Sequence, residues 1–440
     1  MARWPDGAGT ENGRLAFWGR MNGSGDSLLR NAQFLKLWVG QGISFVGDFV
    51  STVALVILVV DLSGSASAVG GILVARLIPT LASPLVGVLA DRLDRRVILV
   101  ASDLARAALV LGIIFARDLT VLYVLVFLLG LARTFFNPTI RAAFPSVVGE
   151  GDLTRANAII SGTFSVSVTV GPALGGLLVA TVGLDAAFTL DAATYLISAA
   201  FLSRIPLPPP EPEDDEERFI RALRAGLSYL ATAPIACAIV IGAFLTVLTA
   251  NLTIPAEVFL AKETFGVGEA GYGLLVGLWG GGMILGSAAA AVLAGRIGLL
   301  PLYFLGIFAT ALGLAGAGVS PAFGLALAAL AVAGASNGVD NVVTDTILQK
   351  RVSSNFLGRV FSVRFLSYSA GEALAYPIGG LVVDATGPRF TYLLAGAVTA
   401  AAGLFILLLV IASTRNAETG EQRFGSENKG APRRETSPRR

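Results

Sequence analysis

Long apolar stretches recur along the whole chain and constrain its fold more than any other feature. Each holds about 20 residues, and about 20 helical residues rising about 1.5 Å each cross the roughly 30 Å hydrocarbon core of a bilayer. A membrane β-barrel would instead alternate apolar and polar residues over segments of about 10 residues, a pattern that the sequence lacks. We therefore expect an all-α membrane protein. The twelve expected helices cover residues 37–62, 68–90, 97–116, 119–138, 158–181, 184–203, 235–260, 270–294, 299–319, 321–345, 361–385 and 388–413.

The composition supports this class and excludes several kinds of site. Hydrophobic residues make up 54% of the chain and charged residues only 14%, which is far less charge than a soluble domain carries. The sequence has no histidine and a single cysteine, Cys237, so we expect no metal site, no cofactor and no disulfide within the chain. Any proton carrier inside the membrane must then be an aspartate or a glutamate.

Basic residues gather in alternate loops. If the N-terminus is cytoplasmic, the expected outer loops carry only Arg117, Lys262 and Arg389, and most of the 32 lysines and arginines lie on the cytoplasmic side. This bias predicts a multi-pass protein of the plasma (inner) membrane with both termini in the cytoplasm. The first thirty residues lack the apolar core of a signal peptide.

Short motifs recur at a constant offset, which indicates an internal repeat. The matching pairs are Arg92 and Arg296, Arg155 and Arg359, Gly175 and Gly379, and Gly176 and Gly380. A polar, proline-rich segment at 205–217 separates the two repeats and is followed by an amphipathic stretch suited to the membrane surface. Two six-helix halves of this kind are typical of secondary transporters, whose substrate site lies near the midplane between the halves.

This organisation gives the chain five expected parts. They are a disordered cytoplasmic N-terminus (1–30), an N-terminal six-helix bundle (31–204), a cytoplasmic linker and surface helix (205–228), a C-terminal six-helix bundle (229–414) and a disordered cytoplasmic tail (415–440).

The stretch "GVLADRLDRR" crowds five charges between two apolar runs. It resembles the loop signature of the major facilitator superfamily, and the resemblance extends over about residues 30–415. It departs from the signature at Asp94, where many members have glycine. The resemblance implies a latch that joins the cytoplasmic ends of the second and eleventh helices, with Arg359 and Arg364 as partners for Asp91. The matching residues are Gly87, Asp91, Arg92, Arg95 and Arg96.

A second motif, "VGPALGG", lies in the fifth expected helix and provides Gly171, Pro172, Gly175 and Gly176. Such residues allow close helix approach and bending, and the motif resembles one found in family antiporters, mostly drug exporters. The segments "QGISFVGDFVSTVAL", "LDAATYLIS", "LTRANAI" and "GRVFSV" further resemble the branch that holds the enterobactin exporter and macrolide-efflux proteins.

Ionisable groups at bilayer depth are costly and mark functional candidates. Asp48 and Glu372 lie near the middle of the first and eleventh expected helices, so we select them as proton or cation carriers, with Arg76 as a partner that holds Asp48 ionised. The alternative is that each carboxylate pairs with an arginine or caps a helix broken at Gly47 or Gly371, the glycines that precede them.

Other polar and aromatic side chains are candidates for the substrate pathway, although polar groups also join helices and aromatic rings also pack. Arg133 resembles an arginine in a fourth-helix signature of the family. Asp103 and Arg106 are instead expected to pair within one helix. Asp191 is expected to serve a structural role. The pathway candidates are Phe45, Phe49, Arg133, Asn251, Glu257, Asn337, Asp340, Asn341 and Tyr368.

These features predict a proton-coupled exporter of amphiphilic small molecules that works by alternating access. A lipid transporter or nutrient importer of the same fold is the alternative. The chain has no nucleotide-binding loop and no nucleophile set beside a base, so we expect neither an enzyme nor an ATP-driven pump. The expected partners are a small-molecule substrate, protons and the lipid bilayer, with no nucleic acid, and the protein is expected to be a monomer.

The latch hypothesis makes one prediction. Asp91→Asn removes the negative charge that faces a helix N-terminus or an arginine, so transport should slow while substrate binding persists. Transport and binding assays on the same preparation check this, and an unchanged transport rate would remove the latch.

Overall fold

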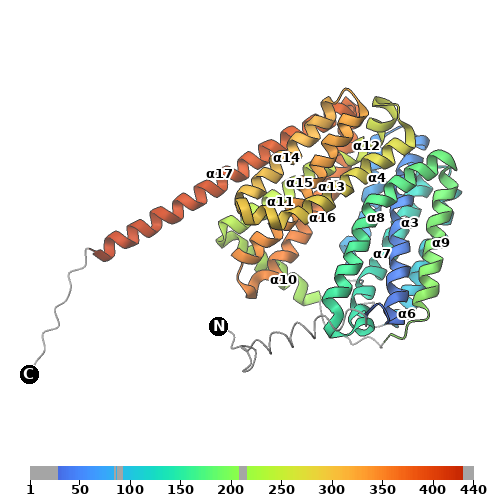
Figure 1. The fold of residues 1–440 in the computed structure, drawn as a ribbon, viewed down its shortest axis with the longest axis horizontal. Helices are drawn as coiled ribbons and strands as arrows, with labels where there is room; N and C mark the ends of the chain where they lie inside the picture. Colours follow the sequence, from blue (N-terminus) through green and yellow to red (C-terminus); the bar gives the residue numbers. More distant parts are fainter. Residues whose placement is uncertain (1–27, 84–85, 87–92, 208–215, 430–440) are drawn as a thin grey trace, which may run out of the picture.

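The computed structural model describes residues 28–83, 86, 93–207 and 216–429, and these residues form an all-α protein without strands (Figure 1). Within these ranges, ten helices are long and apolar enough to cross a membrane. They are α3 (Ala32–Ser63), α6 (Arg95–Ile114), α7 (Leu119–Val148), α8 (Leu153–Thr181), α9 (Leu184–Leu202), α11 (Pro234–Asn251) continued by α12 (Ile254–Phe259) and η3 (Leu260–Thr264), α13 (Gly268–Ile297), α14 (Leu299–Val319), α15 (Phe323–Arg351) and α17 (Pro388–Lys429).

The second and eleventh expected spans coincide with helices that, within the described residues, are not both long enough and apolar enough to be counted among these ten. The second begins on α4 (Ala66–Leu77) and the 3₁₀ turn η1 (Ile78–Ala82), which together form a shorter apolar helix within the described residues, and most of its last seven residues, 84–90, lie outside them. The eleventh falls on α16 (Ser354–Thr386), which has 33 residues. The expected all-α membrane fold is confirmed, whereas the count of twelve spans is not.

The loop signature is described only in part. Gly87, Asp91 and Arg92 lie outside the described residues, and Arg95 and Arg96 begin α6. Asp94, the departure from the family pattern, is the N-cap of α6, because its Oδ1 accepts hydrogen bonds from the backbone N–H of Arg96 at 2.8 Å and of Val97 at 3.2 Å.

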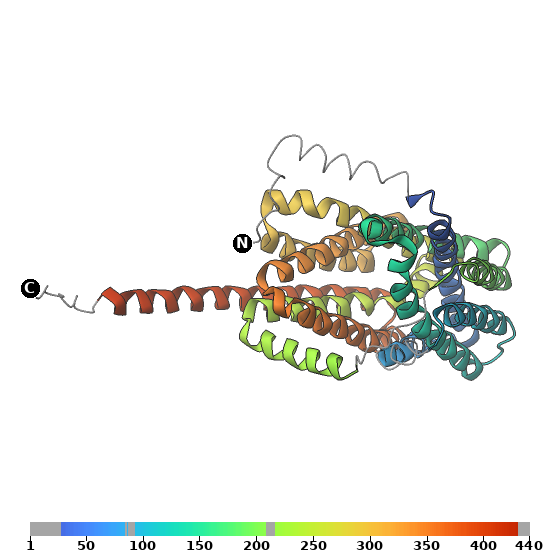
Figure 2. The same cartoon turned by 90° about the horizontal axis from the view of Figure 1, so that it is seen from below.

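One helix lies outside the expected spans, and another extends beyond its own. α10 (Glu216–Thr232) follows the linker and packs against α16, where Gly226 approaches the carbonyl of Arg359. α17 projects beyond the rest of the protein (Figure 2) and continues to Lys429, into the segment expected to be a disordered tail.

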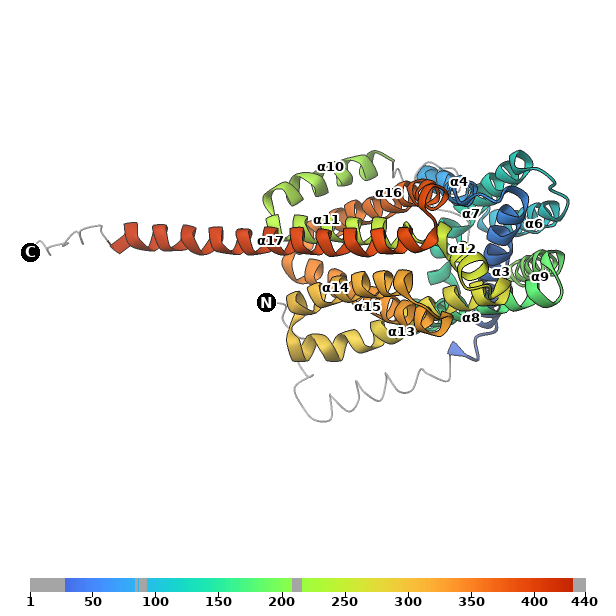
Figure 3. The ribbon, with the colours of Figure 1, turned by 90° about the horizontal axis from the view of Figure 1, so that it is seen from above.

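The helices form two bundles, α3 to α9 and α11 to α17, which lie side by side (Figure 3). Buried apolar residues of both bundles share one core at the end that carries residues 61–68 and 262–269. Toward the opposite end, separate cores fill the second bundle and the first. The halves are therefore joined at the first end, called the joined end below, and separate toward the other (Figure 1).

Glycines bring the two halves into backbone contact. A Cβ at Gly273 of α13 would lie 2.3 Å from the carbonyl oxygen of Pro172 in α8, and one at Gly70 of α4 would lie 2.2 Å from that of Tyr376 in α16. Gly176 likewise faces the carbonyl of Glu269. Small residues permit such approaches between membrane helices.

The contact between α8 and α13 resembles the contact between α16 and α4. Gly176 of α8 meets the first turn of α13, and Gly380 of α16 meets the first turn of α4 at Ala66. Gly176 and Gly380 are equivalent positions of the sequence repeat, so the repeat has a structural counterpart where the halves join.

Polar contacts also cross between the halves at the joined end. Asp384 of α16 accepts hydrogen bonds from the backbone N–H of Ala66 at 2.7 Å and of Ser67 at 3.0 Å, and from Ser65 Oγ at 2.8 Å. A carboxylate of one half thus caps the first turn of a helix of the other half. Lys262 pairs with Asp61 across the halves and with Glu269, each at 3.0 Å.

The glycine contacts predict how a small substitution changes the conformation. Gly273→Ala places a methyl group against a backbone carbonyl that cannot move away freely, so it should shift molecules away from the conformation that is closed at the joined end. Spin labels at Asp185→Cys and Gly324→Cys in a Cys237→Ser background measure this as longer distances. Gly295→Ala is the matched control, because a Cβ there meets nothing within 4 Å. Equal distance distributions for both variants would contradict the prediction.

Candidate functional site

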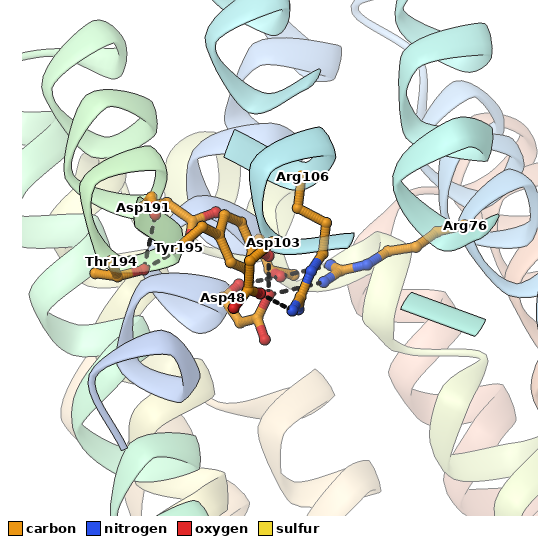
Figure 4. Close-up of polar contacts among 8 residues, drawn as sticks. Asp48, Arg76, Asp103, Arg106, Asp191, Thr194 and Tyr195 are labelled. Atoms are coloured by element: carbon orange, nitrogen blue, oxygen red, sulfur yellow. Dashed lines mark hydrogen bonds and ion pairs between the residues drawn. The ribbon is translucent and has the colours of Figure 1, made fainter. Parts of the chain in front are cut away.

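Asp48 lies in the interior of the first half and is 7% exposed. Its Oδ1 accepts a short hydrogen bond from the hydroxyl of Tyr195 on α9 and lies 4.0 Å from Nη2 of Arg76 on α4 (Figure 4). The structure therefore places Arg76 beside Asp48, as the sequence suggested, and adds a tyrosine that the sequence analysis missed.

Arg76 is held by α3 through a second contact. Its Nη1 donates to Thr52 Oγ1 at 2.6 Å, and this hydroxyl donates at 2.6 Å to the backbone carbonyl of Asp48. Arg133 on α7 lies close enough for its charge to act on both Asp48 and Arg76. The pathway candidate Arg133 thus belongs to the same group of charges.

A second ion pair lies beside Tyr195. Arg106 donates a short hydrogen bond to Asp103 one turn earlier on α6, as expected, and both side chains are almost fully buried. The guanidinium of Arg106 also lies over two rings, at 4.1 Å from the ring centroid of Phe136 and 4.4 Å from that of Tyr195. Tyr195 therefore connects the two pairs, since its hydroxyl contacts Asp48 and its ring contacts Arg106 (Figure 4).

Asp191 lies one turn before Tyr195 on α9 and is fully buried. Its carboxylate accepts a hydrogen bond from Thr194 Oγ1 at 3.3 Å. A Cβ at Gly47 would lie 2.3 Å from that hydroxyl oxygen, so the glycine allows α3 to approach α9. Because α3 and α16 run unbroken through Gly47 and Gly371, neither helix is interrupted as the alternative supposed.

Glu372 lies in the second half, near the boundary between the halves. It accepts a hydrogen bond from the hydroxyl of Tyr376, one turn later on α16, at 3.3 Å. The backbone of Tyr376 touches Gly70 of α4. The helix that carries Arg76 thus contacts α16 close to Glu372.

Most pathway candidates of the second half surround one cavity between α11, α13, α15 and α16. Asn251, Asn337, Asp340, Asn341 and Tyr368 line it together with Arg364.

The other candidates lie outside this cavity. Phe45 and Phe49 pack against Phe164 of α8, with ring centroids 5.3 and 5.8 Å apart, and Glu257 lies in the short helix α12 next to the joined end.

The arginines suggested as latch partners have other contacts in this structure. Arg364 forms an ion pair with Asp345 at 2.6 Å, and Arg359 lies 5.0 Å from the ring centroid of Phe356. Within the described ranges, no three His, Cys, Asp or Glu side chains are grouped so that they could hold a metal ion.

Residues 24–429 match the family described as "Transmembrane secretion effector" (MFS_3). The chain belongs to this family of the major facilitator superfamily, which confirms the resemblance seen in the sequence.

Several curated relatives are named as exporters or efflux proteins. The chain is 29% identical to the putative bacilysin exporter BacE of Bacillus amyloliquefaciens, over 80% of this chain and 88% of that protein. It is 30% identical to the enterobactin exporter EntS of Escherichia coli (strain SMS-3-5 / SECEC), over 78% and 83%. It is 25% identical to macrolide efflux protein A of Streptococcus pyogenes, over 83% and 92%. The protein is therefore a multi-pass membrane transporter of the bacterial exporter type.

Solved structures show the same fold at low sequence identity. A mutant of the nucleoside transporter NupG superposes with a TM-score of 0.72 at 15% identity, covering 86% of this chain and 99% of that one. A bacterial homologue of the iron transporter ferroportin, in an inward-facing state, gives 0.68 at 15% identity and covers 87% and 99%.

The buried pair on α6 makes a prediction about stability. Arg106→Gln leaves the carboxylate of Asp103 buried without its partner, which should cost about 3–5 kcal/mol of the free energy of unfolding. The double variant with Asp103→Asn removes both charges and should recover much of this loss. Unfolding in mixed micelles measures both values, and additive losses would show that the two residues are not coupled.

Proposed function

We propose that this protein is a proton-coupled exporter of amphiphilic small molecules that works by alternating access. The names of its relatives include exporters of an antibiotic and a siderophore and a macrolide-efflux protein, and this range supports an organic substrate that leaves the cell. The protein acts as a monomer in the inner membrane, with both termini in the cytoplasm and without an enzymatic step.

The position of Arg76 carries the proposal. This residue is on α4, which forms part of the boundary between the halves, and its side chain contacts Thr52 and lies beside Asp48 in one half. On the same helix, Gly70 touches the backbone of Tyr376 in the other half, and the hydroxyl of Tyr376 donates to Glu372. The helix that carries the partner of Asp48 therefore contacts the helix that carries Glu372.

Proton exchange at Asp48 changes how strongly Arg76 is held. When Asp48 is ionised, the guanidinium is attracted to α3, and protonation removes that attraction. Arg76 then interacts more with Tyr376 and Glu372 on α16. Because α4 and α16 touch through Gly70, a change in this balance favours one arrangement of the halves over the other.

The driving force is adequate for export. Each proton that crosses a membrane potential of 100 mV contributes about 2.3 kcal/mol. If the joined end faces outward, as the distribution of basic residues predicts, the halves are separate at the cytoplasmic end, from which an exporter takes up its substrate. Closure of the opposite end and opening of the joined end would release the substrate outside.

The test uses inside-out vesicles with an acidic lumen. Cationic, neutral and catecholate amphiphiles are added while the lumenal pH is followed. Wild-type protein should show a proton leak that depends on the compound, and Asp48→Asn and Glu372→Gln should lose most of it, because each variant removes an exchangeable proton. Substrate binding should persist in both.

Glu263→Gln is the matched control, since Glu263 is exposed in η3 and lies outside the group of charges described above. Tyr376→Phe should slow exchange without abolishing it, because it removes the hydroxyl but not a carboxylate. A proton leak that is unchanged in both carboxylate variants would contradict the assignment of carriers. No leak with any compound, from folded protein, would reject proton-coupled export of these compounds and favour a lipid cargo.

A further inference from the structure

The cavity in the second half has a volume of about 120 Å³. A buried water needs about 10–15 Å³ measured in this way, so the cavity has room for a small organic group rather than for one water. Helices α11, α13, α15 and α16 each contribute to its lining, which includes the aromatic residues Trp279 and Tyr368.

Two charged side chains in this lining have hydrogen-bonding atoms without a protein partner. Asp340 is 5% exposed, and its buried Oδ1 accepts no hydrogen bond, while the buried Nε–H of Arg364 donates none. Such buried polar atoms are rare because each costs free energy when unpaired. One is an acceptor and the other a donor, so a ligand that satisfies both must itself contain a donor and an acceptor.

The charges of the cavity favour a cation. Arg364 is already paired with Asp345 at 2.6 Å, and this pair leaves the charge of Asp340 uncompensated among the three. Among the neutral groups, Asn251 donates one amide N–H to the Val247 carbonyl at 2.9 Å, and Asn341 donates one to Asn337 at 3.2 Å. The oxygen of each amide, an acceptor, and its second N–H remain for a ligand.

We propose that this cavity binds the head group of a substrate that carries a protonated amine with a hydrogen-bond acceptor one or two carbons away. The ammonium donates to Asp340 Oδ1, and the neighbouring hydroxyl or carbonyl oxygen accepts from Nε of Arg364. The faces of Trp279 and Tyr368 stabilise the cation further. This assignment depends on the proposed export function, for which it names the substrate class.

The apolar remainder of such a substrate lies outside the cavity. Phe365 and Tyr368 on α16 are 69% and 41% exposed, and Tyr368 also lines the cavity. A substrate with a small amine head and a larger apolar body therefore matches both parts of the site.

The test compares two probes that differ only in the amine. These are 2-amino-3-phenylpropan-1-ol and 3-phenylpropan-1-ol, titrated calorimetrically against the full-length protein in lipid nanodiscs at neutral pH. Wild-type protein should bind the amine about tenfold or more tightly than the deaminated probe, since an opposite charge in a poorly solvated site is strongly attractive. Asp340→Asn should reduce this ratio to near one, and Glu263→Gln should leave it unchanged.

Asp340→Glu covers the case in which the asparagine variant does not fold. It keeps the charge but moves the carboxylate, so it should retain a preference for the amine that is weaker than in wild type. Equal binding of the two probes by wild type, or an undiminished preference in either Asp340 variant, would overturn the assignment.

The vesicle experiment separates this assignment from the proposed function. If wild type exchanges protons for neutral amphiphiles but does not prefer the amine, the cavity assignment fails and the exporter remains. If the amine binds with the expected dependence on Asp340 but no compound causes a proton leak, the binding site stands and proton coupling fails.

Discussion

The backbone contact between α4 and α16 is the constraint on which the rest of this structure depends. Gly70 and Gly380 allow the two helices to touch without intervening side chains, and the glycines of α8 and α13 do the same on the other side of the boundary. Because α4 carries Arg76 and α16 carries Glu372, the two helices that join the halves each carry an ionisable group. Under the proposed alternating access, packing and electrostatics would therefore change together.

Both halves bury charged side chains that keep unpartnered atoms. In the first half, Tyr195 connects Asp48, Asp103 and Arg106 into one group, yet Asp103 Oδ2 and Arg106 Nε have no hydrogen-bond partner, as is also true of Asp340 Oδ1 and Arg364 Nε in the second half. The halves differ because Asp340 and Arg364 line a cavity. This is why we propose a ligand site in the second half and a group that responds to protons in the first.

Much of the fold could be predicted from the sequence. The length of the apolar stretches, the distribution of basic residues among the loops and the internal repeat can all be recognised without knowing which helices touch. The charged candidates were also visible, since an aspartate such as Asp48 inside an apolar run stands out. Tyr195 and Tyr376 were not identified, although Tyr376 follows Glu372 by four residues and so shares its helix face. Tyr195 gives no such signal, because its partner lies on another helix. The roles of Gly47 and Gly70 were equally hidden, since they depend on which backbone lies opposite.

The cap that Asp384 provides for α4 has a consequence for how the transporter can be observed. The backbone N–H groups of Ala66 and Ser67 have no partner within their own helix and are bonded to a carboxylate of the other half. If the halves move by the alternating access that we propose, opening of the joined end removes this acceptor and makes the two amides available to solvent. Their rate of hydrogen–deuterium exchange would then be a label-free measure of how often the joined end opens, built into the chain itself.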